Sequence, residues 1–499
     1  MTVPAQERSA LLQHVLSLVI DASAAYQGTP QARILDEVMA RIHEPLRVAI
    51  AGKVKAGKST LLNALVGDEV APTDAGECTR IVTWYRHGIA SRVWLTPRGG
   101  IAGQIPFTRS GSGALQVQLG NWEANQIESL QVEWPVPPLA TMTLIDTPGI
   151  GSLSSDVSAS SMAFLAPDDE QTTPSDAVVY LLRHLHATDV SFLHAFHEEE
   201  YAQPSPVNCI AVLSRADEVS AGRIDAMTSA SRIAARYATD HRLHRLVQTV
   251  VPVAGLLAQA GTNLQELEFR RLRMISAAEP DDREKLLLSA DRFVIGDTTV
   301  PLAPNERRLL IERLGLFGIR LAVDLLGTGQ AQTASQLANQ LVGHSGITHL
   351  RDVLLSQFAD RRDTLKARSA LLAVQRLLQM APVARSGELE ARVEQIRSGA
   401  HEFAELRLLN SLRAGEVDFR PDEGREVERL LGGDGGSIRA RLGLESQADE
   451  DEVRRALFVS LGRWRQRAEN PVSSLATSAA SRVLVRTCEG LYAGLVTVR

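Results

Sequence analysis

The spacing of hydrophobic positions changes character near Gly255. Between Leu46 and Gly255, short apolar runs alternate with helical or loop segments, which is the rhythm of a doubly wound α/β domain. After Gly255, and in residues 1–45, apolar side chains recur at helical spacing and strand patterns nearly vanish. The pattern therefore predicts an α/β domain with a mostly parallel sheet and flanking helices, followed by an all-α bundle that the N-terminal helices complete.

Individual elements follow from the same pattern. The predicted strands are Leu46–Ala51, Arg80–Arg86, Val93–Thr96, Gln131–Trp134, Thr141–Ile145, Ala177–Leu182, Val207–Leu213 and Thr249–Val253. In the helical part, the longest periodic stretch runs from about Ile347 to Met380 without a break. We expect three parts: residues 1–45 as N-terminal helices of a neck or stalk, residues 46–365 as the α/β domain, and residues 366–499 as a helical bundle that forms the neck and a short stalk.

Charge and cysteine content narrow the class of protein. The net charge is −6, from 53 basic and 59 acidic side chains, and no Lys/Arg run indicates a nucleic-acid partner. The cysteines Cys78, Cys209 and Cys488 are odd in number and far apart, which predicts a reduced, cytoplasmic protein without disulfides or a zinc site. No apolar run is long enough and free enough of charge to span a bilayer. We therefore expect a soluble chain that lies at most on the inner face of the cell membrane.

One segment carries a phosphate-binding motif. The residues GKVKAGKST fit G-x-x-x-x-G-K-[ST], in which backbone N–H groups cradle phosphates and the lysine reaches the terminal ones. A predicted strand precedes the motif, the predicted helix Ser59–Val66 follows it, and three of the five lysines of the chain lie in it. We therefore expect a nucleotide-phosphate site formed by Gly52, Lys53, Val54, Lys55, Ala56, Gly57, Lys58, Ser59 and Thr60.

A second motif, DTPG, follows the predicted strand Thr141–Ile145. An aspartate at the carboxyl end of a strand can hold Mg²⁺ through water, which is the role we expect for Asp146, and the Gly149 N–H is expected to reach the γ-phosphate. Thr79 stands before a strand, between the two motifs, where a switch threonine would ligate Mg²⁺ and hold the attacking water. An ordinary Pro–Gly turn at residues 146–149 and a Thr79 without function are the alternatives.

A third motif, SRAD, indicates which base is bound. It resembles the N/T-K-x-D sequence that reads guanine, with Ser214 and Arg215 at the two departures. The Asp217 carboxylate can accept hydrogen bonds from N1–H and the 2-amino group of guanine, and adenine offers neither. Arg215 can lie over the base, and we expect the segment Val253, Ala254 and Gly255 to place a backbone N–H against the guanine oxygen. A helix N-cap is the alternative for SRAD.

With these motifs the chain resembles the bacterial dynamin-like GTPases, in particular the shorter kind of isoniazid-inducible dynamin-like protein of mycobacteria. The resemblance covers nearly the whole chain and is carried by GKVKAGKSTLLNALVGDEVAPTD, CTRIVTWYRHG, DTPG, SRADE, GRIDAM, VVPVAGLLA, GLFGIR and SGITHLRDVLLSQFADRRDTLKA. It implies an enzyme that hydrolyses GTP to GDP and phosphate, with Ser59, Thr79 and Asp146 around Mg²⁺. It also implies that dimerisation of GTPase domains is coupled to a helical stalk that remodels the cytoplasmic membrane.

The residue after DTPG raises a question about catalysis. It is Ile150, where Ras-like GTPases carry a water-orienting glutamine, so we expect slow hydrolysis unless another group supplies charge. Lys55 stands where dynamins have serine, and its ammonium could act like an arginine finger in cis and replace a monovalent cation. A solvated lysine is the alternative. Asp189 resembles the dynamin aspartate that contacts the partner subunit, with an N-cap role as its alternative. The expected catalytic residues are Lys55, Lys58, Thr79 and Gly149.

The length outside the α/β domain limits the membrane apparatus. It suffices for one four- or five-helix bundle, so we expect a truncated stalk, with direct membrane contact only at the Leu430–Leu444 turn. Leu314–Leu326 and Arg463–Arg467 are expected to be a packed helix and a solvated helix face. The implied partners are a second copy, a longer dynamin-like relative and an acidic lipid surface. A regulatory switch GTPase that controls a protein partner without mechanical work is the alternative function.

Overall fold

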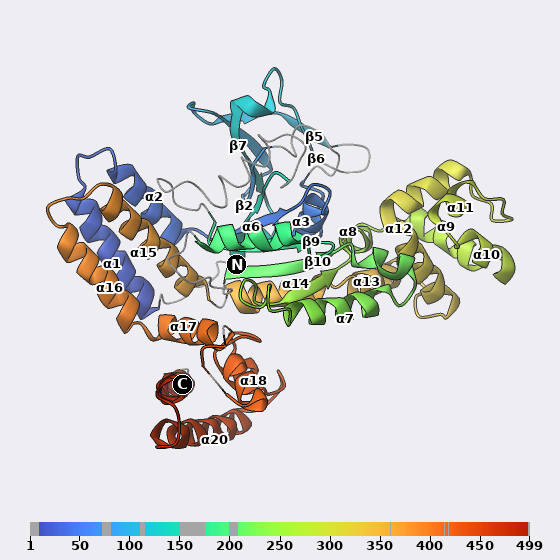
Figure 1. The fold of residues 1–499 in the computed structure, drawn as a ribbon. Helices are drawn as coiled ribbons and strands as arrows, with labels where there is room; N and C mark the ends of the chain where they lie inside the picture. The colour runs from blue at the N-terminus through green and yellow to red at the C-terminus, as the bar shows by residue number, and fades with distance from the viewer. Residues whose placement is uncertain are drawn as a thin grey trace.

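The chain folds around one large sheet with helices on both faces and further helical groups beside it (Figure 1). The computed structural model describes residues 9–71, 81–109, 115–149, 175–198, 208–359, 361–413, 415–417 and 419–497. Thr79, for which the sequence predicts a role in catalysis, and Ile150, at the position of the water-orienting glutamine of Ras-like GTPases, lie outside the described residues.

The strands confirm the predicted mostly parallel sheet. Their bounds are β1 Leu46–Gly52, β2 Thr83–His87, β3 Arg92–Pro97, β4 Gly103–Ile105, β5 Phe107–Arg109, β6 Leu115–Val117, β7 Ile127–Trp134, β8 Met142–Asp146, β9 Ala177–Leu182, β10 Cys209–Ser214 and β11 Val250–Val253. Nine of them form the sheet in the order β11-β10-β9-β1-β8-β2-β7-β3-β4, and β5 pairs with β6 apart from it. The β8–β2, β7–β3 and β3–β4 pairs are antiparallel, and the other pairs of the main sheet are parallel. The sequence pattern missed only the short β4, β5 and β6.

The helices fall into three regions along the chain. Those of the α/β domain are η2 Ala124–Gln126, α3 Lys58–Val66, α4 Pro138–Thr141, α6 Ala187–Glu198, η4 Ala216–Gly222, α7 Ala226–Ala238, α8 Gly255–Thr262, α13 Ala334–His344 and α14 Ile347–Leu354. A lobe at the right of Figure 1 consists of α9 Glu266–Ser276, α10 Pro280–Leu286, α11 Ala290–Ile295 and α12 Pro304–Gly327. The remaining elements are α1 Ala10–Ala25, α2 Ala32–His43, the π-helical η5 Leu355–Ala359, α15 Arg362–Met380, α16 Ser386–Gly399, α17 His401–Arg413, α18 Pro421–Leu430, α19 Ile438–Leu442, α20 Glu450–Glu469 and α21 Leu475–Thr497.

Strand β1 lies at the centre of the sheet, between β8 and β9. Its side chains alternate between two buried faces: Val48 and Ile50 lie in the core that includes residues of α3, α8 and α14, and Ala49 lies in the core that includes residues of α6 and α7. A strand covered on both faces is apolar throughout, which is why its sequence is a continuous apolar run. The register pairs Ile50 with Asp146, so the DTPG motif begins beside the phosphate loop.

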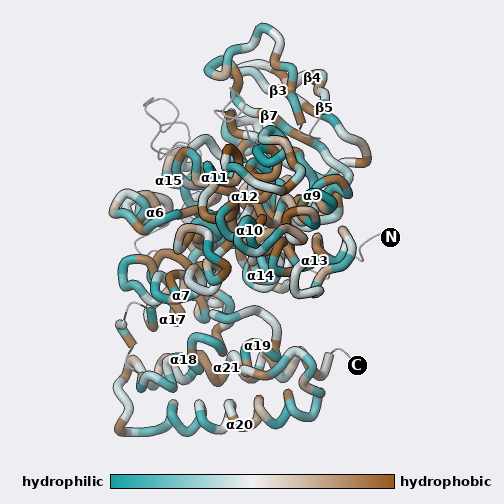
Figure 2. Tube along the Cα trace, turned by 90° about the vertical axis from the view of Figure 1, so that its right-hand side faces the viewer, coloured by the Kyte–Doolittle hydropathy of each residue, from teal (hydrophilic) through white to brown (hydrophobic). Residues whose placement is uncertain are grey.

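The helical region forms two groups, which corrects the single bundle predicted from the sequence. Helix α1 contacts α2, α15 and α16, whereas α21 contacts α17, α18 and α20. Helix α16 ends at Gly399, and the extended backbone of Ala400 separates it from α17. Figure 2 shows helices α17 to α21 as a layer of their own below the rest of the chain. The predicted domain boundaries at residues 45 and 365 stay a prediction.

The predicted unbroken helix Ile347–Met380 is wrong. The π-helical segment Leu355–Ala359 follows α14, and α15 starts afresh three residues later. Two side chains at this break bind the loop after α18. Gln357 Nε2 donates to the Gly433 carbonyl oxygen (3.1 Å), and the Arg361 guanidinium donates to the Gly432 carbonyl oxygen (2.6 Å). Tertiary hydrogen bonds therefore stabilise a break that the periodicity of the sequence does not contain.

The same contacts bury the first two leucines of the Leu430–Leu444 turn, while membrane contact by the rest of the turn stays a prediction. Leu430 and Leu431 are 1% and 2% exposed, and the Arg361 guanidinium also donates to the Leu431 carbonyl oxygen (3.0 Å). An apolar residue that is already buried inside its own chain has no surface left for lipid. In this structure the turn packs on the junction between α14 and α15.

Two other segments that could have met membrane are engaged within the chain. Leu314, Phe317 and Leu321 of α12 are buried, which confirms a packed helix at Leu314–Leu326. Trp464 is buried on α20, and the arginines beside it pair with glutamates of α18 and α21, which confirms a solvated face with an anchored indole. Among the described residues, no helix is long and apolar enough to cross a membrane.

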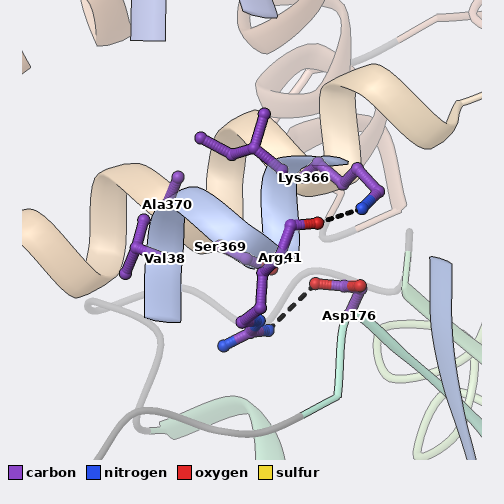
Figure 3. Close-up of a pocket in the computed structure, with 7 residues that line it drawn as sticks. Val38, Arg41, Asp176, Lys366, Ser369 and Ala370 are labelled. Carbon is purple, nitrogen blue, oxygen red and sulfur yellow. Dashed lines mark hydrogen bonds and ion pairs between the residues drawn. The ribbon is translucent and has the colours of Figure 1, made fainter. Parts of the chain in front are cut away.

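A charged cluster joins helices α2 and α15 to the sheet (Figure 3). The buried Asp176, just before β9, accepts from the Arg41 guanidinium of α2 (3.0 Å) and from the Arg47 backbone N–H of β1 (2.9 Å). Lys366 of α15 donates to the Arg41 carbonyl oxygen. Burial lowers the pKa of Lys366 to about 8; Asp176 opposes this shift, whereas Arg362, Arg47 and Arg41 add to it. Elements far apart in sequence are thus fixed to one carboxylate at the base of the sheet.

We expect Lys366→Met to remove a pH-dependent contribution to stability. Because the folded pKa of about 8 lies below the unfolded value of 10.5, the unfolded chain binds one more proton between these values, and the stability of the native sequence rises with pH in that window. The rise is at most about 3 kcal/mol, and the variant is expected to lack it. Urea unfolding at about pH 7 and about pH 10 measures both chains. Lys285→Met, at an exposed lysine, is the control, and identical pH profiles for native chain and Lys366→Met would contradict the expectation.

Candidate nucleotide site

The phosphate loop joins β1 to α3, and its glycines are required by space and conformation. Gly52 has a φ of 149°, and a Cβ there would lie 2.7 Å from the Leu181 carbonyl oxygen of β9. Gly57, directly before α3, has a φ of 93°. Lys55 has a φ of 62°, a left-handed conformation that is strained for a residue with a side chain. The loop leads directly into the first turn of α3, whose backbone N–H groups have no partner within the helix. Such N–H groups at the start of a helix bind phosphate.

Lys58, Ser59 and Asp146 meet at the phosphate end. The Lys58 ammonium donates to the carbonyl oxygens of Gly52 (3.3 Å) and Lys53 (3.4 Å), and Ser59 Oγ donates to Asp146 Oδ2 (3.0 Å). Burial raises the pKa of Asp146, opposed by Lys58 and Ser59. Among the described residues, Asp146 Oδ1 is buried and has no hydrogen-bond partner. A buried carboxylate oxygen without a donor, next to a serine hydroxyl, fits Mg²⁺ or a water bound to it, because this cation prefers hard oxygen ligands.

Gly149 lies directly against the phosphate loop. A Cβ at this position would come within 2.6 Å of Val54 Cγ2 and 2.8 Å of Val54 Cα. The preceding Thr147 donates from Oγ1 to the Ile50 carbonyl oxygen of β1 (2.9 Å), which holds DTPG beside the loop. The close approach explains why a glycine ends the motif, and it brings the Gly149 backbone to the phosphate end of the site.

A cleft of about 590 Å³, open solvent included, continues from the phosphate loop to the SRAD motif. Asp217 lines it, is 9% exposed, and has a pKa raised by burial. Ser214 and Arg215 line it as well. The Ser214 hydroxyl donates to a carbonyl oxygen of β9 (3.3 Å), and the Arg215 guanidinium donates to the Lys55 carbonyl oxygen (3.1 Å). Arg215 therefore connects the base end of the cleft to the phosphate loop.

The predicted contact through the Ala254 N–H is corrected by the structure. This N–H donates to the carbonyl oxygen of Ser345, in the loop between α13 and α14 (2.9 Å). Gly255 and Leu256, the first two residues of α8, line the cleft together with Val253. N–H groups in the first turn of a helix have no intrahelical partner, so these two residues offer the free backbone donors at the base end. The sequence named Gly255 as part of this segment but not Leu256, and it could not exclude the Ala254 N–H because Ser345 is remote in the chain.

Comparison with known proteins identifies the family. Residues 48–215 match the Dynamin family. The isoniazid-induced protein IniC of Mycobacterium tuberculosis is 41% identical over 476 residues, which cover 94% of this chain and 96% of that protein. The chain belongs to the dynamin family.

More distant dynamins are also similar to parts of the chain or to all of it. A bacterial dynamin-like protein of Nostoc punctiforme is 28% identical over 114 residues, 21% of this chain and 16% of its own length. A solved structure of an oligomerised bacterial dynamin pair covers 99% of this chain and 77% of its own chain at 11% identity, with a TM-score of 0.29. The dynamin family consists of GTP-hydrolysing proteins, and membership of this family supports a dynamin-like GTPase.

One contact beside the cleft of this dynamin-family chain escaped the sequence analysis. Helix α12 kinks at Gly315, which has a φ of 65°, and a Cβ there would lie 3.7 Å from Asp217 Oδ2. Arg320, one turn further along, donates to the Gly222 carbonyl oxygen (2.7 Å), just after the SRAD segment. The helical lobe thus packs directly against Asp217, the residue for which the sequence predicts base recognition. The signal in the sequence is a glycine that interrupts an apolar helical pattern.

The sequence left two roles open for Asp189, contact with a partner subunit and capping of a helix. The structure favours capping. The carboxylate is 1% exposed and accepts from the His186 backbone N–H at the start of α6 (3.0 Å). It also accepts from the Tyr180 hydroxyl (2.8 Å) and the Lys53 ammonium (3.0 Å). Burial, with Asp189 beside it, raises the pKa of Tyr180. Both carboxylate oxygens are bound within the chain, so Asp189 joins α6 to the phosphate loop.

Proposed function

We propose that this chain binds GTP with Mg²⁺, hydrolyses it to GDP and phosphate, is activated when two GTPase domains pair, and uses the cycle to bind and remodel the cytoplasmic membrane. The observation that carries the proposal is the cleft that runs from Gly57 of the phosphate loop to Asp217, next to the point where Ser59 meets Asp146. This arrangement supports a nucleotide with its phosphates at α3 and its base at SRAD. Family membership supports the nucleotide chemistry, and the membrane step rests on the resemblance alone.

Each residue of the cleft has a role in this reaction. The loop from Gly52 to Thr60 holds the phosphates, and the Lys58 ammonium neutralises charge on the terminal ones. Ser59 and Asp146 would hold Mg²⁺, which supplies charge neutralisation between the β- and γ-phosphates. The Gly149 N–H meets the γ-phosphate while water attacks phosphorus and the bond to the bridging oxygen breaks, so that GDP leaves. Thr79, outside the described residues, stays the predicted second ligand and water-positioning group.

Recognition of the base is divided between a side chain and the backbone. The Asp217 carboxylate accepts from N1–H and the 2-amino group of guanine, and the N–H groups of Gly255 and Leu256 are placed to meet the guanine oxygen. Arg215 covers the base from the SRAD side while its guanidinium contacts the Lys55 carbonyl oxygen. Ser214 stabilises the loop through β9.

Lys55 is proposed as the group that replaces a monovalent cation. It is exposed, its backbone is held in the left-handed region, and strain of this kind persists where surrounding structure fixes it for function. Lys55→Ala is expected to lower kcat by about a hundredfold in sodium buffer, because one charge that stabilises the transition state is lost. Phosphate release with and without K⁺ measures this, and Lys285→Ala is the control. A native rate for Lys55→Ala without added K⁺ would contradict the role.

The dimerisation step has its own test. Specific GTP turnover is measured against the concentration of the full-length chain. A superlinear rise supports activation by pairing, and a specific rate independent of concentration contradicts it. A longer dynamin-like relative, the other proposed protein partner, is tested by adding it at fixed concentration.

The alternative function is a regulatory switch GTPase that acts on a protein partner without mechanical work. The presence of complete phosphate and Mg²⁺ residues supports both readings equally. Nucleotide-dependent assembly on vesicles separates them. Assembly that deforms vesicles only with GTP supports the membrane function, and turnover without any vesicle association favours the switch.

A further inference from the structure

Arg320 of α12 connects two loops that lie far apart in the sequence. Its guanidinium donates to the carbonyl oxygens of Ala221 (3.0 Å) and Gly222 (2.7 Å), the last two residues of η4. It also donates to the carbonyl oxygens of Leu287 (2.6 Å) and Leu288 (3.1 Å), directly after α10 of the helical lobe. A guanidinium presents its donors in a rigid planar fork, so these bonds fix η4 relative to the lobe.

The end of η4 has a backbone conformation that its own sequence disfavours. Ser220, Ala221 and Gly222 follow one another in the left-handed region, with φ values of 54°, 57° and 67°. This region is unfavourable for a residue with a Cβ, and two of the three residues have one. Ser220 and Ala221 are also exposed, so burial of their side chains does not stabilise them. The bonds from Arg320 supply a tertiary contact that stabilises this strained segment.

The strained segment folds back onto Asp217. A Cβ at Gly222 would lie 3.4 Å from the Asp217 carbonyl oxygen and 3.7 Å from Arg320 Nη1, and a Cβ at Gly315 would lie 3.7 Å from Asp217 Oδ2. Among the described residues, no side chain donates a hydrogen bond to the Asp217 carboxylate. The position of this carboxylate therefore depends on the backbone of η4 and on α12, which Arg320 joins.

We infer that Arg320 is a positioning residue for base recognition. By fixing η4 against the helical lobe, it holds the Asp217 carboxylate where both N1–H and the 2-amino group of guanine can donate to it. The inference rests on the proposed function, because it explains how Asp217 is kept in place for the role proposed there. Two parallel hydrogen bonds to one edge of a base require a fixed orientation of the carboxylate. Arg320 is not among the described residues that line the cleft, so it acts through Asp217.

A comparison of GTP with inosine triphosphate tests this role. Inosine triphosphate keeps N1–H and the 6-oxo group but lacks the 2-amino group, so the native full-length chain is expected to have the higher kcat/KM for GTP. Arg320→Gln is expected to lower the ratio of the two kcat/KM values by about tenfold, mainly through the KM for GTP, because a charge-assisted hydrogen bond is lost. The ratio does not depend on how much of the protein is folded, so a loss of stability alone leaves it unchanged.

Two further variants separate positioning from other effects. Arg308→Gln, at an exposed arginine of the same helix, is the matched control and is expected to keep the native ratio. Asp217→Ala is expected to lower the ratio by itself. Adding Arg320→Gln to Asp217→Ala is expected to cause no further fall, because the carboxylate through which Arg320 acts is then absent.

Arg320→Lys makes the test independent of whether Arg320→Gln folds. A lysine keeps the charge, but its single ammonium does not present the fork that spans both loops. The ratio for this variant is therefore expected to fall in the same direction by a smaller factor.

Three outcomes would overturn the inference. They are a native ratio in Arg320→Gln or, where that variant does not fold, in Arg320→Lys; an equal fall in Arg308→Gln; and a further fall when Arg320→Gln is added to Asp217→Ala. A native chain without GTP turnover, or without preference for GTP over inosine triphosphate, would instead contradict the proposed function and the inference with it. The native chain alone thus distinguishes the two failures.

Discussion

Lys58→Ala is expected to reduce GTP turnover by a factor on the order of a thousand. The Lys58 ammonium lies at the start of α3, bound to the carbonyl oxygens of Gly52 and Lys53, and it is the cation of the loop aimed at the terminal phosphates. In a partly dehydrated site, one such donor contributes about 3–4 kcal/mol to the transition state. The substitution is expected to keep helix α3 intact, because alanine is the strongest helix former.

The measurement is phosphate release at saturating GTP and Mg²⁺, together with GTP affinity. Lys285→Ala, at an exposed lysine of α10, is the matched control and is expected to behave as the native chain. Lys53→Ala is unsuitable as a control because it would leave the buried Asp189 without its ammonium partner. Turnover of Lys58→Ala within about tenfold of the native rate would contradict the proposed site.

Asp217→Asn is expected to shift preference from GTP to xanthosine triphosphate. The carboxylate accepts from N1–H and the 2-amino group of guanine; the amide of asparagine keeps one acceptor and gains a donor that suits the 2-oxo group of xanthine. The mismatch with GTP leaves a buried polar pair unsatisfied and is expected to cost at least about a hundredfold in kcat/KM. Asp217 is buried in the cleft beside α12, so water cannot replace the lost bond easily.

Competition between the two nucleotides measures this change. Glu218→Gln is the control: its carboxylate is adjacent in sequence, pairs with Arg183 and Arg215, and is 44% exposed. It is expected to leave the preference for GTP intact. If Asp217→Asn keeps the native preference, the base lies elsewhere and SRAD has only the N-cap role.

Local sequence patterns predicted the sheet well. Strand β1 is a continuous apolar run because helices cover both of its faces, and Gly52 is glycine because the Leu181 carbonyl oxygen leaves no room for a Cβ. Such requirements act between neighbours in sequence or in adjacent strands, so they leave a direct trace in residue type. The order of the motifs along the chain could be predicted for the same reason, because each motif directly follows a strand.

The helical region was predicted less well, because helical spacing does not specify which helices pack together. The periodic run from Ile347 to Met380 contains no proline or glycine, yet the bonds from Gln357 and Arg361 to the loop after α18 accompany a break in it. The same contacts bury Leu430 and Leu431, the first residues of the turn for which the sequence predicted membrane contact.

By itself, the sequence determined that this protein has an α/β nucleotide domain with a phosphate loop and a guanine-type motif, because strand burial, tight turns and strand-end aspartates each demand particular residues at fixed spacing. Only the tertiary structure decided that Ser345 occupies the Ala254 N–H, that Gly315 of α12 packs against Asp217, and that the helices form two groups. Each of these depends on a contact between residues far apart in the chain, whose free energy no local pattern contains.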